Sequence, residues 1–337
     1  MAAASQSLEG RSLSVVTAVY NGEASLAELC RRLGEVLPRV AARHEIILVN
    51  DGSLDRSWEV ILGLSSRSPV VRGLNLMRNY GQHNALLCGI RAAEYEVIVT
   101  MDDDLQHPPE EIPRLLARFE EGFDVVYGAP KAEQNGLMRA LASRITRLAL
   151  SAAVGRDVAK NVSAFRVFPT QLREAFAAYQ SPFVSIDVLL TWATTRFGAT
   201  TVAFQPRHSG SSNYTFTKLV RHALDMMTGF STAPLQLASL IGFGCTLFGI
   251  GVLIYVVGRY FLEGSIPGFP FLASVIAIFS GAQLFALGVI GEYLARMHFR
   301  TMDRPTYAVR QTTRPARGAP SGAASSLVEK ETKAVEA

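Results

Sequence analysis

Short apolar segments alternate with amphipathic ones over residues 11–205. Runs rich in β-branched and other apolar residues end in polar residues and predict strands at 13–20, 44–51, 70–77, 96–103 and 124–129. Apolar residues at helical spacing lie between them and predict helices within 25–43, 82–93 and 109–122. This alternation predicts an α/β domain with a mostly parallel sheet and helices on both faces. We expect the domain to span residues 12–212, after a flexible segment of residues 1–11.

Two uncharged apolar runs, residues 237–257 and 269–290, follow in the last third of the chain. Each exceeds the roughly 20 residues that a helix needs to cross a bilayer, and both are rich in Gly, Ser and Ala. They predict two transmembrane helices within residues 235–294, the alternative being a buried helical hairpin in a soluble protein. Basic residues flank the pair at 218–222 and 295–304, so the positive-inside rule predicts an inner-membrane protein with its α/β domain and both termini cytoplasmic.

Two further segments border the apolar runs. Residues 213–234 alternate apolar and basic side chains with helical spacing, which predicts interfacial amphipathic helices on the lipid headgroups. A solvated surface helix is the alternative. Residues 295–337 form a predicted cytoplasmic segment, and their Ala, Ser, Pro, Gly and charged residues predict disorder from about residue 311.

Composition narrows the classes of partner. Hydrophobic residues make up 49% of the chain and the formal net charge is only +4, which favours a membrane surface over nucleic acid. The 3 cysteines are widely spaced and indicate neither a zinc site nor a disulfide framework. The N-terminal residues have no apolar stretch behind a basic start, so we expect no cleaved secretory signal.

Three consecutive carboxylates, residues 102–104, lie at the end of a predicted strand. Polar clusters at the carboxyl ends of parallel strands are where such sheets bind ligands. One interpretation is a solvated turn. The other is a Mg²⁺ or Mn²⁺ site, because Asp102, Asp104 and Gln106 share one side of an extended segment while Asp103 points away. An EF-hand is excluded, since its Gly and distal Glu are missing.

Other residues with catalytic potential have weaker contexts. His83 and His107 are interpreted as hydrogen-bonding loop residues, because no second zinc ligand lies at metal spacing. A Ser lies near Asp within residues 51–55, but the strained turn of a hydrolase nucleophile is absent, so Ser-His-Asp catalysis is set aside.

Four motifs resemble, in order and spacing, those of family 2 glycosyltransferases of GT-A (Rossmann-like) fold: "SVVTAVYNGEASL" (14–26), "ILVNDGSLDRSW" (47–58), "RNYGQHNALLCGI" (78–90) and "MDDDLQHPPEEIP" (101–113). Over residues 12–308 the chain resembles the polyprenyl-phosphate glycosyltransferases, which include dolichyl-phosphate mannose synthase-like and undecaprenyl-phosphate glucosyl- and aminoarabinose-type enzymes. The resemblance implies inverting, metal-dependent transfer of a sugar from a nucleotide sugar, UDP-linked, to undecaprenyl phosphate at the cytoplasmic face. It also implies a homo-oligomer.

The resemblance implies a role for individual residues. Mg²⁺ or Mn²⁺ is expected on Asp102, Asp104 and Gln106, and the catalytic residues are expected to be Asp102, Asp104, Arg166 and Arg207, the last closing over the diphosphate. Nucleotide contacts are expected from Ala18, Tyr20, Asn21, Asp51 and Asp103. The acceptor phosphate is expected at Arg166 and Ser163, with Arg139 and Arg144 as further clamps or, alternatively, as a basic helix face on the membrane.

The chain departs from the family pattern at four positions. Ala18 and Gly22 replace the usual Pro and Glu, Asn50 replaces an Asp, and Ala164 replaces the Asp of phage-type enzymes.

Two other functions are alternatives to this transfer reaction. A processive polysaccharide synthase would carry a QxxRW motif, yet neither Trp58 nor Trp192 follows an Arg. A non-catalytic, membrane-tethered nucleotide-sugar-binding protein is the second alternative.

Overall fold

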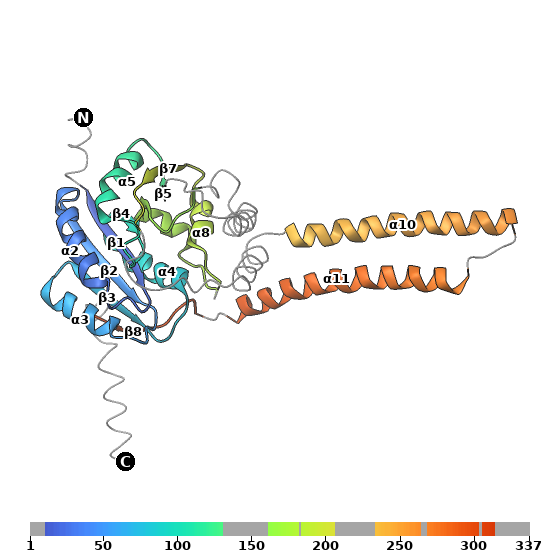
Figure 1. Cartoon of the computed structure of the whole chain (residues 1–337), viewed down its shortest axis with the longest axis horizontal. Helices are drawn as coiled ribbons and strands as arrows, with labels where there is room; N and C mark the ends of the chain where they lie inside the picture. Colours follow the sequence, from blue (N-terminus) through green and yellow to red (C-terminus); the bar gives the residue numbers. More distant parts are fainter. Residues whose placement is uncertain are drawn as a thin grey trace, which may run out of the picture.

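The α/β part of the chain forms one mixed, mostly parallel sheet (Figure 1), as predicted. A computed structural model describes residues 11–130, 161–181, 183–205, 233–263, 268–302 and 305–313. The sheet is 8-stranded, in the order β7, β5, β6, β4, β1, β2, β3, β8. The strands are β1 (Ser12–Val19), β2 (Arg43–Asn50), β3 (Val71–Leu76), β4 (Val97–Thr100), β5 (Val125–Pro130), β6 (Arg166–Pro169), β7 (Phe197–Val202) and β8 (Val309–Thr312). Strands β4, β1, β2 and β3 pair in parallel, whereas β6 and β8 run antiparallel to their neighbours.

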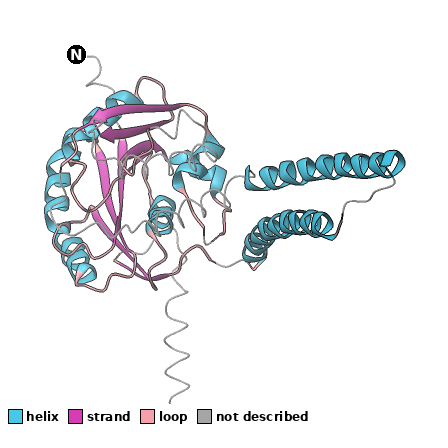
Figure 2. Cartoon of the chain, turned by 45° about the vertical axis from the view of Figure 1, so that its right-hand side comes forward, coloured by secondary structure: helices cyan, strands magenta, loops and turns pink. Residues whose placement is uncertain are grey.

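Helices cover both faces of this sheet (Figure 2), which confirms the predicted layers. They are α2 (Leu26–Val36), α3 (Ser57–Arg67), α4 (Gln82–Ala92), α5 (Ile112–Phe119) and α8 (Ile186–Ala193), with short 3₁₀ turns η1 (Leu37–Arg39), η2 (Pro109–Glu111) and η3 (Thr170–Phe176). Successive strand residues enter opposite cores: Val15 packs with α2, α3 and α5, and Val16 packs with α4 and α8. Because both faces are covered, the central strands are almost entirely buried, and each carries apolar residues that enter the two cores.

Two long helices, α10 (Ala233–Glu263) and α11 (Phe269–Thr301), project side by side from the α/β part (Figure 1). They pack at Gly249, where a Cβ atom would lie 2.8 Å from Phe279 Cζ. The segments Pro234–Leu262 and Ile278–His298 are long and apolar enough to cross a membrane, and 0% of each apolar window is buried. This exposure contradicts the buried-hairpin alternative. Both helices extend beyond the predicted spans of 237–257 and 269–290.

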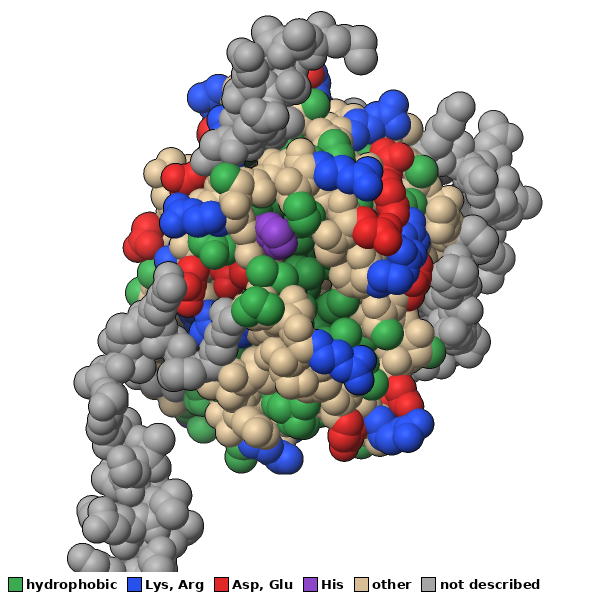
Figure 3. All heavy atoms as spheres, turned by 90° about the vertical axis from the view of Figure 1, so that its left-hand side faces the viewer, with side chains coloured by type: hydrophobic (Ala, Val, Ile, Leu, Met, Phe, Trp, Pro, Cys, Tyr) green, Lys and Arg blue, Asp and Glu red, His purple; other side chains and the backbone are tan. Residues whose placement is uncertain are grey.

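The surface that faces away from α10 and α11 carries many charged side chains, with hydrophobic ones between them (Figure 3). Figure 3 shows acidic and basic side chains interspersed over it. Ion pairs on and beside α2 join Arg31 with Glu28 and Glu35, and Arg32 with Glu110. Such a surface suits contact with water, so the apolar helices and the charged surface lie at opposite ends of the molecule.

The segment after α11 returns to the sheet. Strand β8 pairs antiparallel with β3, and the Met77 N–H donates to Ala308 O at 2.9 Å. Gly73 N donates to Thr313 Oγ1 at 2.9 Å, and Thr313 N donates back to Gly73 O at 3.0 Å. The prediction of disorder from about residue 311 is therefore wrong for the residues up to Thr313, which the sheet edge orders. The predicted interfacial segment 213–234 lies outside the described residues, except for the first residues of α10.

Candidate functional site

The loops after β1 and β2 are joined by hydrogen bonds at the carboxyl edge of the sheet. Asn21 N donates to Ser53 Oγ at 3.0 Å, and Leu54 N donates to Asn21 Oδ1 at 2.9 Å. Gly22 N donates to Ser57 Oγ at 2.9 Å. Asn21 has a φ of 55°, a left-handed conformation that Asn tolerates better than most residues. The Asn21 side chain therefore connects the loops after β1 and β2. Its contact with a nucleotide stays a prediction.

Asp51 attaches the loop after β3 to the loop after β2. Its Oδ1 and Oδ2 accept hydrogen bonds from Tyr80 N at 2.7 Å and Gly81 N at 2.9 Å. Burial raises the pKa of Asp51, and the two N–H groups and nearby Arg78 offset part of that rise. Asp51 thus fixes the backbone that leads into α4, which is a different task from the predicted nucleotide contact.

Tyr20 remains accessible beside these connected loops. Its side chain is 48% exposed at the end of β1, where an aromatic ring can stack on a flat base. Ala18, two residues earlier, is half-buried and packs against the core on the α4 side. Of the predicted nucleotide contacts in this part of the chain, Tyr20 and Asn21 are exposed and Ala18 is half-buried.

The carboxylate segment turns sharply after β4. Asp102 Oδ1 accepts a hydrogen bond from Gln82 Nε2 at 2.6 Å, and Asp104 Oδ1 accepts one from Gln106 N at 3.1 Å. Leu105 has a φ of 60°, which is strained for a leucine, and its side chain is only 2% exposed. The buried Leu105 side chain thus anchors a turn that brings Gln106 back toward Asp104.

Asp103 points into the protein rather than toward solvent. Its Oδ2 is enclosed without a hydrogen-bond partner among the described residues, and a Cβ atom at Gly22 would lie 2.3 Å from that oxygen. The backbone N–H of Tyr20 donates to Asp103. Burial, and then the charges of Asp102 and Asp104, raise the pKa of Asp103 to about 7. Asp103 therefore forms the wall between the β1 loop and the carboxylate turn.

The donor set at this turn suits a hard divalent cation. Asp102, Asp104 and Gln106 are each partly exposed and offer oxygen ligands. Within the described ranges no group of three His, Cys, Asp or Glu side chains could hold a metal ion by itself. Mg²⁺ typically takes one or two carboxylates and completes its shell with water and substrate phosphates. The residues present fit such an ion.

Arg166 is a buried arginine inside the sheet. It is 1% exposed, its Nη1 pairs with Asp187 Oδ1, and its Nε donates to Thr100 Oγ1 at 3.0 Å. Tyr127 OH also donates to Asp187 Oδ1, at 3.0 Å. Because this guanidinium is enclosed, a lipid phosphate could reach it only after the surrounding side chains rearrange. The acceptor role of Arg166 stays a prediction, and the contacts seen here join β4, β5, β6 and α8.

The polar residues Ser163, His107 and His83 differ in their exposure and in their contacts. Ser163 is partly exposed, accepts a hydrogen bond from Phe165 N at 3.2 Å, and lies 3.5 Å from His107 Nε2. His107 packs between Phe165 and Phe204, and burial lowers its pKa. His83 Nδ1 accepts a hydrogen bond from Ile186 N at 3.3 Å, as the hydrogen-bonding interpretation predicted, but His83 lies in α4 and not in a loop. Arg139, Arg144 and Arg207 lie outside the described residues.

Sequence reasoning missed the roles of two residues at or near the site. Gln82 belongs to a quoted motif, but its contact with Asp102 depends on how α4 begins. Asp187 had no sequence signal, since a single Asp before an apolar helix resembles an ordinary first-turn residue. Its burial and its pairing with Arg166 appear only in the fold.

Comparison with known proteins connects this site to a family. Residues 14–177 match the family described as Glycosyl transferase family 2. The undecaprenyl-phosphate 4-deoxy-4-formamido-L-arabinose transferase of Pseudomonas aeruginosa is 35% identical over 306 residues, which is 90% of each chain. The enzyme of the same name from Pectobacterium carotovorum is 34% identical over 310 residues, covering 91% of this chain and 95% of its own.

A solved structure has the same kind of fold. Glucosyl-3-phosphoglycerate synthase from Mycobacterium tuberculosis, in complex with Mn²⁺, UDP and glucosyl-3-phosphoglycerate, superposes with a TM-score of 0.50 at 16% identity, covering 67% of this chain and 80% of its own. At this identity the comparison concerns the fold alone. It agrees with the GT-A arrangement of a mostly parallel sheet with a ligand edge at the carboxyl ends of its strands.

Proposed function

We propose, from the premise that this chain belongs to glycosyl transferase family 2 and is a glycosyltransferase, that it transfers a sugar from a nucleotide sugar to undecaprenyl phosphate. One observation carries the proposal: the match to undecaprenyl-phosphate transferases covers 90% of the chain, so it includes the apolar helices as well as the α/β domain. A water-soluble acceptor would leave those exposed helices unexplained.

The donor is proposed to bind along the loops after β1, β2 and β4. Tyr20 would stack on the base, within loops ordered by Asn21 and Asp51. Asp102, Asp104 and Gln106 would hold Mg²⁺ or Mn²⁺, which would offset the charge developing on the departing diphosphate. UDP is the proposed nucleotide, and the solved synthase of the same fold binds UDP with Mn²⁺.

The reaction is proposed to proceed in one displacement. An oxygen of the lipid phosphate forms the new bond to the anomeric carbon, while the bond from that carbon to the diphosphate oxygen breaks. The electron pair leaves with the nucleoside diphosphate, and the anomeric configuration inverts. Because the acceptor phosphate is already anionic at neutral pH, it needs alignment rather than a general base.

The acceptor is proposed to approach from the membrane. Helices α10 and α11 would anchor the enzyme in the inner membrane, with the α/β part on the cytoplasmic side and copies associating as a homo-oligomer. Ser163, Arg139 and Arg144 would contact the acceptor phosphate, and Arg166, which pairs with Asp187 in the structure, would join them. Arg207 would close over the donor diphosphate.

Purified full-length protein in detergent tests this function directly. Undecaprenyl phosphate, Mn²⁺ and radiolabelled UDP-sugars should give label in the organic phase, and UDP-4-deoxy-4-formamido-L-arabinose is the first donor to try because of the relatives. NMR of the product should show inversion at the anomeric carbon. Donor binding without lipid-linked product across the UDP-sugar panel would instead favour the non-catalytic alternative.

A further inference from the structure

Gln82 is the first residue of α4 and lies against the carboxylate turn. Its Nε2 donates to Asp102 Oδ1 at 2.6 Å, across 20 residues of sequence. Gln82 itself is exposed and makes no part of either hydrophobic core. Its side chain therefore contributes little to packing, and its notable contact is with a carboxylate proposed to bind the cation.

The position of Gln82 is fixed by the start of α4. Asp51 holds the backbone N–H groups of Tyr80 and Gly81. Gly81 then turns the chain with a φ of 96°, a conformation that favours glycine, and α4 begins at the next residue. The buried carboxylate of Asp51 thus fixes the backbone position from which the Gln82 side chain extends.

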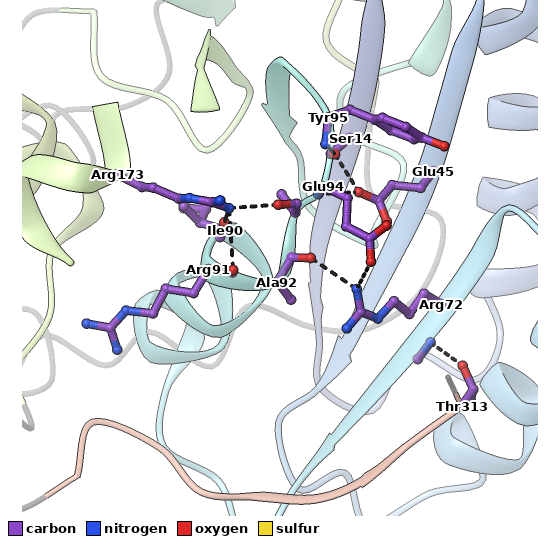
Figure 4. Close-up of polar contacts among 12 residues, drawn as sticks. Ser14, Glu45, Arg72, Ile90, Arg91, Ala92, Glu94, Tyr95, Arg173 and Thr313 are labelled. Carbon is purple, nitrogen blue, oxygen red and sulfur yellow. Dashed lines mark hydrogen bonds and ion pairs between the residues drawn. The ribbon is translucent and has the colours of Figure 1, made fainter. Parts of the chain in front are cut away.

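Helix α4 is also held along its length and at its far end. A Cβ atom at Gly89 would lie 2.3 Å from Val16 Cγ1, so the helix lies very close to β1. Figure 4 shows Arg72 and Arg173 converging on the last turn of the helix. Arg72 Nη1 donates to Ala92 O at 3.0 Å, and Arg173 donates to carbonyl groups of the same turn, including Ile90 O at 3.3 Å. Carbonyls that would otherwise lack partners are satisfied, and the helix cannot shift easily.

The chemistry of the contact fits a site that binds a cation. Asp102, Asp103 and Asp104 are consecutive carboxylates, and their charges repel one another. Gln82 supplies a donor that restrains Asp102 without adding a positive charge. A Lys or Arg at the same position would form an ion pair with Asp102 and compete with a metal ion.

We propose that Gln82 is a positioning residue for Asp102: its amide holds the carboxylate in the orientation that receives the divalent cation. This inference rests on the proposed function, in which Asp102 and Asp104 bind Mg²⁺ or Mn²⁺. Groups that hydrogen-bond to metal ligands commonly change metal affinity by about 10-fold to 100-fold when removed.

Gln82→Met tests the proposal, because methionine keeps the length and helix preference of glutamine but cannot donate a hydrogen bond. Free Mn²⁺ is measured by electron paramagnetic resonance with the full-length wild type and variants, with Mn²⁺ alone and with Mn²⁺ plus UDP. Gln171→Ala is the matched control, since Gln171 is exposed on η3. Thermal unfolding verifies that each variant is folded.

We expect Gln82→Met to weaken Mn²⁺ binding by about 10-fold or more, with the control unchanged and the unfolding temperature retained. Excess Mn²⁺ should then restore turnover, which a merely structural role would not produce. Mn²⁺ binding by Gln82→Met within about twofold of the wild type would overturn the role of Gln82 alone. A wild type that binds no Mn²⁺ would overturn the proposed cation site and this inference with it.

Discussion

Gly22 and Asp103 adjoin so closely that a Cβ atom at position 22 would lie 2.3 Å from Asp103 Oδ2. The β1 loop therefore rests directly on the carboxylate turn. We expect Gly22→Ala to lower the free energy of unfolding by about 1–3 kcal/mol, since the added methyl group overpacks an enclosed space. Chemical denaturation of the purified protein measures the change.

A double-mutant cycle assigns that loss to its cause. In an Asp103→Ala background the methyl group has room, so Gly22→Ala should cost much less there. Gly34→Ala is the control, because Gly34 lies in α2 with nothing within 4 Å of its built Cβ, and alanine should be neutral or stabilising. Equal losses with and without Asp103 would contradict the assignment.

The buried pair of Arg166 and Asp187 makes a second prediction. Asp187→Asn leaves a guanidinium in the interior without its counter-charge, so we expect a loss of about 3–5 kcal/mol in unfolding free energy. Glu28→Gln, which removes one of the two exposed partners of Arg31, should change stability far less. If Asp187→Asn is equally mild, Arg166 is not committed to the pair and is available to the acceptor phosphate.

Asp104→Asn should separate activity from stability. Asp104 is partly exposed at the turn, so its replacement should leave the unfolding temperature nearly unchanged. Turnover should fall by about 100-fold or more if the carboxylate holds a cation that stabilises the departing diphosphate. Chelation with EDTA should give a comparable loss that Mn²⁺ reverses. Unchanged product formation in Asp104→Asn would rule out the proposed metal site.

The reactivity of the Cys88 thiol shows whether the segment after α11, which contains Tyr307, shields this cysteine from solvent. Burial raises the pKa of Cys88 to about 12, and Tyr307 hydrogen-bonds to its side chain. At pH 8 the thiolate fraction is then very small, so maleimide should modify native Cys88 slowly. Deleting residues 305–337 removes Tyr307 and β8, and should speed modification by about tenfold or more.

Cys30 is the internal control for that measurement. Burial also raises its pKa to about 12, but it lies on α2, in the core on the other face of the sheet. Its modification, followed by mass spectrometry of the same digests, should not change on truncation. Equal acceleration at both cysteines would indicate general unfolding instead of loss of a local cover.

The sequence revealed the central strands because their environment is simple. Strands β1, β2, β3 and β4 are covered on both faces, so they contain apolar runs, such as residues 46–49 of β2, that are visible in the sequence without a partner. Strand β8 has four exposed residues, Val309–Thr312, and becomes a strand only through its pairing with β3. Strand β6 begins with a buried arginine, whose partner Asp187 lies 21 residues away. Such tertiary partners have no periodic signal.

In the candidate site, too, some features could be predicted from the sequence and others depend on tertiary contacts. Parallel strands place their carboxyl ends at one edge, which is why the polar clusters after β1, β2, β3 and β4 could be grouped in advance. Their individual tasks could not be predicted. The side chains of Asn21 and Asp51 accept hydrogen bonds from the backbone N–H groups of Leu54 and Tyr80. The position of a backbone N–H depends on how its loop folds and not on the identity of the residue to which it belongs.

Strand β8 also sets an order of events during synthesis. Gly73 and Thr313, which hydrogen-bond across the sheet edge, are 240 residues apart, and both apolar helices are made between them. Until the chain has returned from α11, the edge of β3 is an open template that other chains can join. The sheet can therefore be completed only after α10 and α11 have been synthesised.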